Sequence, residues 1–300
     1  MSLAEERMER LAGEPLRDTN TPRGFISGVA QSVSVIWSRR ELILLLVKRE
    51  IKSRYKDSAL GLVWSMIRPL MMLLIYYLVM GQFLGAVRMI PNFAIYVYTG
   101  LTVWSLFNEI VMMGTRSIVE NAGIIKKIYL PREIFPLAAV GSAAFNFAVQ
   151  LIILLLAAFT VGGGVNGSHL LYPVLGIMVA TIWGTALALI LSATNVYLRD
   201  IQHLVEVLLL IGFWASPVVY SWPMVASKVG TTLQEIYMAN PITVAVFGMQ
   251  NGLWVGNGDP SFAPDHLLAR LLITLGVGLV ALFFCQRVFD RLQRNFAQEI

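Results

Sequence analysis

Residues 171–194 read LYPVLGIMVATIWGTALALILSAT and contain no charged side chain. A helix of about 20 mostly apolar residues crosses the ~30 Å hydrocarbon core of a bilayer, so this stretch predicts a membrane span. Five other stretches pass the same test, at approximately residues 62–84, 94–116, 134–161, 203–221 and 267–287. The sequence therefore predicts an all-α integral membrane protein with six transmembrane helices in each chain.

The composition of the whole chain agrees with this fold. Its 300 residues are 57% hydrophobic and only 14% charged, whereas a typical soluble domain is about 25% charged. Six spans leave no room for a separate ATPase or glycosyltransferase domain, which would need about 100 residues or more. The sequence holds a single cysteine and no catalytic motif or metal-ligand spacing, so we expect neither catalytic nor metal-binding residues.

Positive charges indicate which side of the membrane each loop faces, because cytoplasmic loops retain Lys and Arg during insertion. Residues 236–254 are apolar on average but include Asn240, Pro241 and Gln250, and a seventh span there would place the C-terminal arginines outside. We therefore expect cytoplasmic tails at 1–38 and 291–300, a six-span domain at 59–290, and a re-entrant outer segment at about 224–262. This distribution explains the net charge of +5 without a nucleic-acid partner.

A basic amphipathic helix is predicted at residues 39–58, RRELILLLVKREIKSRYKDS, just before the first span. Its apolar residues recur at i, i+4 spacing, and such a helix buries this side in the inner membrane interface. The apolar line consists of Ile43, Val47, Ile51 and Tyr55. The cations of this helix either anchor it to any anionic lipid or hold the diphosphate of a lipid-linked substrate, for which guanidinium groups are best suited. Arg68 in span one either snorkels to the interface or faces a pore. The candidate headgroup residues are Lys48, Arg49, Lys52, Arg54 and Arg68.

A short cytoplasmic helix is predicted between spans two and three, in the segment VENAGIIKKIYLPRE at 119–133. Asn121 is a suitable helix N-cap, and Pro131 stops a helix before it. A short helix with apolar and basic residues that projects from the bilayer is suited to docking on a soluble partner, although a solvated loop would have the same composition. The candidate docking residues are Asn121, Ile124, Ile125, Lys126, Lys127 and Tyr129.

Several residues inside the predicted spans are candidates for a transport path. Aromatic rings stack on the C–H faces of sugars and so suit a glycan pore, while the alternative is a pair of interfacial aromatic belts. Glu109 lies within span two, where a charge costs several kcal/mol unless it is solvated or paired. Pro217 interrupts span five near its outer end, as a structural kink or as part of a gate. The pore candidates are Tyr98, Trp104, Phe107, Phe213 and Trp214.

Four segments, taken in order, resemble one family: the permease subunits of ABC transporters that export lipid-linked polysaccharides of the O-antigen, capsule or teichoic-acid type. The segments are KREIKSRYKDSALGLVWSMIRPL (48–70), NAGIIKKIYLPREIFPLAAVGSAAFNF (121–147), NVYLRDIQHLVEVLLLIGFWASPVVYSWPMV (195–225) and NPITVAVFGMQNGLW (240–254). The likeness covers roughly residues 40–290, whereas the first 38 residues resemble nothing comparable.

This resemblance implies a homodimer that pairs with two copies of a nucleotide-binding subunit in the bacterial inner membrane. It also implies that 121–130 is the coupling helix and that the substrate is a polyprenyl-diphosphate-linked glycan. The chain lacks a GxxxxGK[ST] loop, so we expect ATP and Mg²⁺ on the partner and no cofactor here. A drug or lipid exporter of the same fold and an ion-coupled secondary transporter are the alternatives.

Overall fold

The computed structural model describes residues 37–56, 61, 63–127, 130–160, 169–254 and 262–296. The chain divides into two units, Met1–Ser38 and Arg39–Ile300, and all of the helices named below belong to the second unit. Most of the predicted N-terminal tail and the end of the predicted C-terminal tail lie outside the described residues.

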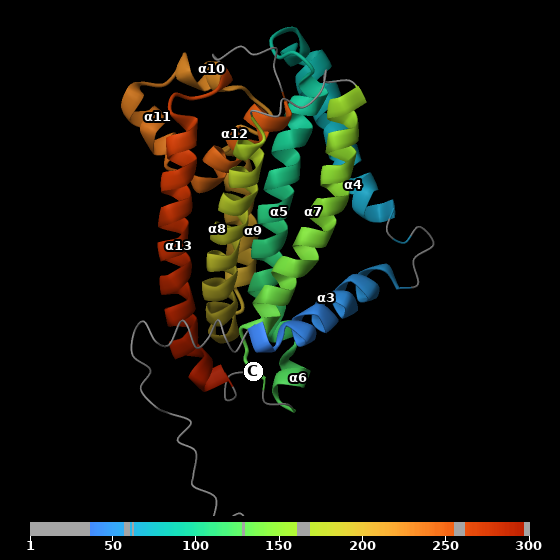
Figure 1. The fold of residues 1–300 in the computed structure, drawn as a ribbon, viewed down its shortest axis with the longest axis vertical. Helices are drawn as coiled ribbons and strands as arrows, with labels where there is room; N and C mark the ends of the chain where they lie inside the picture. The colour runs from blue at the N-terminus through green and yellow to red at the C-terminus, as the bar shows by residue number, and fades with distance from the viewer. Residues whose placement is uncertain are drawn as a thin grey trace, which may run out of the picture. The chain divides into compact units, whose positions relative to one another are not determined.

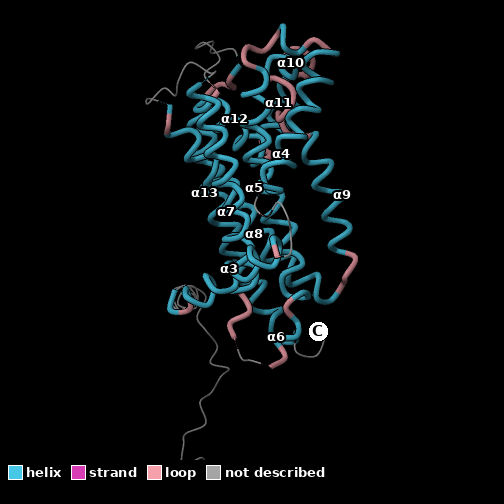
Figure 2. Tube along the Cα trace, turned by 90° about the vertical axis from the view of Figure 1, so that its right-hand side faces the viewer, coloured by secondary structure: helices cyan, strands magenta, loops and turns pink. Residues whose placement is uncertain are grey.

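The second unit is built from helices, and its described residues contain no β-strand. Four long helices run side by side in Figure 1: α5 (Phe93–Glu120), α7 (Ile134–Thr160), α8 (Leu171–Tyr197) and α13 (Leu267–Leu292). Beside them lie α4 (Val63–Tyr76), which continues as a π-helix over Tyr77–Phe83, and α9 (Ile201–Trp214). Figure 2 shows α9 at the edge of this bundle.

Shorter helices mark the two ends of the bundle. One end carries α6 (Ala122–Ile125), and α3 (Arg40–Tyr55) crosses the long helices near it. The opposite end carries α10 (Trp222–Ala226), α11 (Thr231–Met238) and α12 (Pro241–Leu253). We refer to these as the α6 end and the α10 end.

The predicted spans all fall on helices, although not all of these helices have the length or composition of a span. Among the described residues, four helical stretches are long and apolar enough to cross a membrane, at Val63–Phe83, Ile134–Thr160, Leu171–Tyr197 and Leu267–Leu292. Helix α5 has 28 residues, but Asn108 and Glu109 interrupt its apolar character. Helix α9 is apolar and has only 14 residues, so the predicted span 203–221 is helical only as far as Trp214.

Helix α8 lies at the centre of the packing and contacts α5, α7, α12 and α13. Small residues allow its neighbours to approach closely, as is common between membrane helices. A Cβ atom on Gly176 of α8 would lie 2.7 Å from the carbonyl oxygen of Ala245, and one on Gly248 would lie 2.9 Å from that of Tyr172. These two glycines therefore fix the distance between α8 and α12.

Most of the segment between α9 and α10 is buried although it is not α-helical, since residues 216–219 and Ser221 are buried whereas Ala215 is exposed. Its backbone carbonyls need hydrogen-bond donors, because water is excluded from such a position. The Tyr96 hydroxyl donates to the Tyr220 carbonyl at 2.7 Å, and the Gln250 amide donates to the Pro217 carbonyl at 2.8 Å. The prediction that the helix is interrupted near Pro217 is confirmed, and α5 and α12 supply the missing donors.

Helix α3 packs part of its apolar line against protein and also carries an exposed apolar side. Ile43 packs against the apolar cluster that includes Ile118 and Phe135. Val47 lies where a Cβ atom on Gly141 of α7 would be only 2.6 Å from it. The exposed apolar side chains of α3 include Leu44 and Leu45, which are 65% and 62% exposed.

Candidate functional site

The predicted coupling segment contains a short helix, but Asn121 acts there in a different way from the one expected. The Ile125 amide donates to the backbone carbonyl of Asn121, so α6 begins directly after it. The Asn121 side chain makes no cap hydrogen bond. Its amide donates to the Ser117 carbonyl at 2.8 Å, and its oxygen accepts from Arg49 at 2.5 Å. Asn121 therefore joins α3 to the end of α5.

Helix α6 is apolar, and two basic residues follow it directly. Ile124 and Ile125 pack against the cluster that includes Ile118 and Phe289. Lys126 and Lys127 follow them and are exposed. Tyr129, the last of the predicted docking residues, lies outside the described residues. The helix is thus held on α5 by its apolar residues, while the two lysines that follow it remain exposed.

An open cleft of about 560 Å³ lies between α3 and α6 and brings together two sets of residues that the sequence suggested separately. Its lining includes the cations of Arg49 and Lys127 and the carboxylates of Glu50 and Glu120. Glu120 lies beyond the predicted span 94–116. Burial raises the pKa of Glu120, the nearby Glu50 raises it further, and Arg116 opposes the shift. Because both signs of charge are present, this cleft suits a protein surface better than a lone phosphate. Its lining is Arg49, Glu50, Ser53, Glu120, Asn121, Gly123, Ile124 and Lys127.

A second contact holds α3 deeper in the bundle, through Glu109. Arg54 forms an ion pair with Glu109 at 2.5 Å and reaches the Met113 sulfur at 2.9 Å. The same carboxylate oxygen of Glu109 accepts a hydrogen bond from Asn146 of α7 at 2.6 Å. Both arginines that suited a diphosphate therefore contact groups of this chain, whereas Lys48, Lys52 and Arg68 are exposed.

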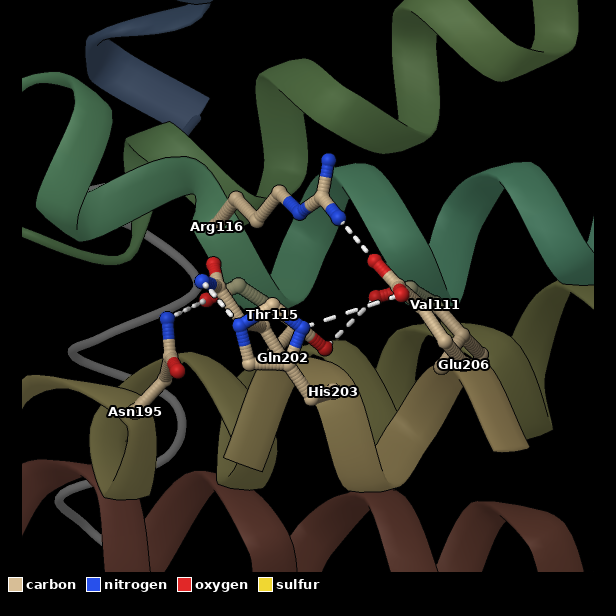
Figure 3. Close-up of polar contacts among 7 residues, drawn as sticks. All are labelled: Val111, Thr115, Arg116, Asn195, Gln202, His203 and Glu206. Atoms are coloured by element: carbon tan, nitrogen blue, oxygen red, sulfur yellow. Dashed lines mark hydrogen bonds and ion pairs between the residues drawn. The ribbon is translucent and has the colours of Figure 1, made fainter. Parts of the chain in front are cut away.

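An ion pair ties α9 to α5 at the same end. Figure 3 shows Arg116 pointing toward Glu206, with His203 beside the same carboxylate at 3.8 Å. Asn195 of α8 donates to the Thr115 carbonyl of α5 at 3.1 Å. In the part of the chain that the structure describes, no group of three or more His, Cys, Asp or Glu side chains is placed to hold a metal ion.

The five predicted pore aromatics fall into two groups. Tyr98, Trp104, Phe107 and Phe213 are buried between helices of the same chain, with exposed fractions of 2%, 8%, 6% and 9%. The rings of Trp104 and Phe213 meet edge to face, with centroids 5.6 Å apart. Trp214 is 48% exposed. In this conformation, only Trp214 of the five presents a substantial surface to a passing molecule.

Sequence reasoning missed the pairing of polar side chains with Glu109 and with the Pro217 carbonyl. Asn146 and Gln150 lie four residues apart within an apolar stretch, and Gln250 lies within the segment taken as re-entrant. A polar amide inside an apolar helix is a usable signal, because it needs a partner when buried. The partner itself depends on helix packing, so the contacts of Asn146 with Glu109 and of Gln250 with Pro217 were not predictable.

Comparisons with known proteins agree with this arrangement. Residues 41–254 match the family described as ABC-2 type transporter. The O-antigen export system permease protein RfbA of Myxococcus xanthus is 28% identical over 268 residues, which cover 89% of this chain and 98% of that protein. The protein of the same description from Klebsiella pneumoniae is 25% identical over 258 residues, which cover 86% of this chain and 94% of that protein. Because the family match extends over most of its length, this chain belongs to the ABC-2 type transporter family.

Proposed function

We propose that this chain is the transmembrane subunit of an ATP-driven exporter. It moves a polyprenyl-diphosphate-linked polysaccharide, of the O-antigen, galactan, capsule or teichoic-acid type, out of the cytoplasm across the inner membrane. The observation that carries the proposal is the likeness to O-antigen export permeases over nearly their whole length. The geometry around α6 supports it, since two exposed lysines follow this helix and one of them, Lys127, lines an open cleft at one end of the bundle.

In the proposed arrangement, α4, α5, α7, α8, α9 and α13 are the six spans and α11 and α12 form the re-entrant segment. The α6 end and both termini then face the cytoplasm, in agreement with the placement of basic residues along the chain. Two chains form the pore. The exposed sides of α4 and α9 support this pairing, since none of the described residues of α4 is buried within the chain.

In the proposed cycle, two partner ATPases bind ATP and Mg²⁺, close on each other, and displace α6. Because Ile124 and Ile125 pack against the apolar cluster that includes Ile118 of α5, a displacement of α6 is passed to that cluster. Lys48 and Lys52 of α3 attract the anionic headgroup of the substrate or of neighbouring lipid. Trp214 contacts the glycan, and the other four rings reach it only when the helices separate.

The first test is purification of the tagged chain from its native membrane in a mild detergent, with an ATPase assay and identification of co-purifying proteins. We expect a nucleotide-binding subunit in equal ratio to the chain. A chain that carries out substrate export without any ATPase, in vesicles with an imposed ion gradient, would overturn the proposal in favour of an ion-coupled transporter. Crosslinking within the membrane before extraction controls for loss of the partner in detergent.

The nearest alternative is an exporter of drugs or small lipids within the same family. The reconstituted complex distinguishes the two, because its ATPase rate is measured with a polyprenyl-linked glycan and with a short-chain lipid of equal charge. We expect stimulation by the glycan only. Trp214→Ala should reduce this stimulation, while Trp104→Ala should reduce the stability of the chain instead, since Trp104 is buried.

A further inference from the structure

The interface between α5 and α7 carries polar side chains at helical spacing. Ser105 and Glu109 on α5 face a row on α7 whose members are four residues apart. Asn146 donates to Glu109 at 2.6 Å, and Gln150 donates to Ser105 at 3.4 Å. We call this set the polar seam, and it consists of Ser105, Glu109, Ser142, Asn146 and Gln150.

Two members of the polar seam have hydrogen-bonding capacity that the described residues do not use. Ser142 is 1% exposed and Gln150 is 4% exposed. The Ser142 hydroxyl and the Gln150 carbonyl oxygen have no hydrogen-bond partner in the described part of the chain. Leaving such a group unsatisfied costs about 1–3 kcal/mol, and buried polar groups are normally bonded to protein or to ordered water. A small polar molecule, such as water, would satisfy these two atoms of the seam.

A small cavity adjoins both the open cleft and the helix turns next to the seam. Behind the open cleft between α3 and α6 lies a cavity of about 30 Å³ that shares Arg49 and Asn121 with the cleft. Its inner wall includes Met113, one turn from Glu109 on α5, and Ala138, one turn from Ser142 on α7. A water molecule needs a cavity of about 10–15 Å³ on the same measure of volume, so this cavity is large enough for one.

We propose that ordered water enters from the cleft, passes through the 30 Å³ cavity and extends along the polar seam as far as Gln150. The water satisfies Ser142 and Gln150 and solvates the carboxylate of Glu109. Water beside Glu109 lowers further the cost of separating the ion pair of Glu109 with Arg54, in which the two side chains are 21% and 33% exposed. The attachment of α3 to the bundle is thereby reversible.

Radiolytic hydroxyl labelling of the full-length chain in its native membrane tests this proposal, because radicals formed from bound water modify the side chains beside it. Phe135 of α7 lines the small cavity, whereas Phe247 of α12 does not. Each of the two is 2% exposed. We expect Phe135 to be modified about tenfold faster than Phe247, since only Phe135 lies beside water. The labelling rates of Phe135 and Phe247 are measured in the natural chain, so the comparison does not depend on any substitution.

Two cysteine variants test the seam itself, in a Cys285→Ala background that removes the single native thiol. Ser142→Cys places a thiol on the seam, and Ala143→Cys places one at the next residue, where the exposed fraction is 0%. We expect oxidation at position 142 to be about tenfold faster than at position 143. Equal, slow labelling of Phe135 and Phe247 would show that the cavity is dry. Equal, slow oxidation at positions 142 and 143 would show that the seam is dry. Either result would overturn the proposed continuous route.

Discussion

Two regions of the bundle are held by different kinds of polar contact, namely the non-helical segment 215–221 at the α10 end and the contacts of α3 and α9 with α5 at the α6 end. At the α10 end, neutral groups make buried hydrogen bonds, such as Gln250 to the Pro217 carbonyl and Tyr96 to the Tyr220 carbonyl. At the α6 end, charged side chains make partly exposed contacts, such as Arg49 with Asn121 and Arg116 with Glu206. The side chains of the second pair are 38% and 43% exposed.

This difference separates a fixed end from an adjustable one. A buried neutral hydrogen bond is costly to break, because the freed group finds no water to replace its partner. An exposed ion pair contributes little to stability and exchanges readily with water, salt or another charged group. The α10 end is therefore built to keep one geometry, and the α6 end is built to respond to a partner.

The largest effect is expected at the adjustable end, from reversing the charge of the two lysines that follow α6. Lys126→Glu together with Lys127→Glu should lower export at least about tenfold, because the partner's surface no longer complements α6. The measurement is export and ATP hydrolysis in the reconstituted complex. The chain itself should unfold at an unchanged temperature, since both lysines are exposed. Unaltered coupling would contradict the assignment of 121–130.

The next largest effect is expected at the fixed end, from Gln250→Leu. This change leaves the buried Pro217 carbonyl without its 2.8 Å donor, which should lower the free energy of unfolding by about 2 kcal/mol. Thermal unfolding of the purified chain measures it. Gln82→Leu is the matched control, because Gln82 is exposed and should change the stability by less than about 0.5 kcal/mol. Equal effects at both positions would erase the contrast between the two ends.

A smaller effect is expected from Glu109→Gln, which removes the charge that Arg54 contacts. The side chains of Arg54 and Glu109 are 33% and 21% exposed, so the loss of stability should be only about 1 kcal/mol. ATP-dependent export should stay largely intact, since this carboxylate anchors α3 and carries no transported ion. Abolished export from a correctly assembled complex would favour ion coupling instead.

The smallest effect is a pH dependence confined to the α10 end. Hydrogen bonds from Arg270 lower the pKa of Glu235, with contacts at 2.8 and 2.9 Å. Because the folded pKa lies below the unfolded value, the stabilisation is present above the ordinary carboxylate pKa and is lost as the pH falls below about 4. Thermal unfolding across this range should show a shift that Glu235→Gln removes. An identical shift in the variant would assign the pH dependence to another group.

The fold was largely predictable because hydropathy marks apolar helices directly. The predicted bounds 134–161 and 171–194 differ little from those of α7 and α8. The end of α9 was less predictable, because Pro217 signals an interruption without fixing its position. The helix ends at Trp214, where donors from Tyr96 and Gln250 make non-helical backbone possible. Those donors come from distant parts of the sequence.

The candidate site was predictable in its residue types but not in its pairings. The sequence identified Arg49 and Asn121, yet the two are 72 residues apart and meet only through the packing of α3 against the bundle. Hydropathy also does not distinguish a ring that faces a pore from one that faces a neighbouring helix. Trp104 and Phe107 were therefore predicted to line a pore, whereas in this conformation they lie in the core of the chain.

The shortness of α9 has a consequence for the surrounding lipid. Its 14 residues extend about 21 Å, whereas the hydrocarbon core is ~30 Å thick. In the six-span arrangement, this hydrophobic mismatch is relieved if the bilayer thins locally beside α9 or if the paired backbone of residues 215–221 enters the hydrocarbon. Either response deforms the membrane next to α9, so the activity of the exporter should depend on the acyl-chain length of the surrounding lipids.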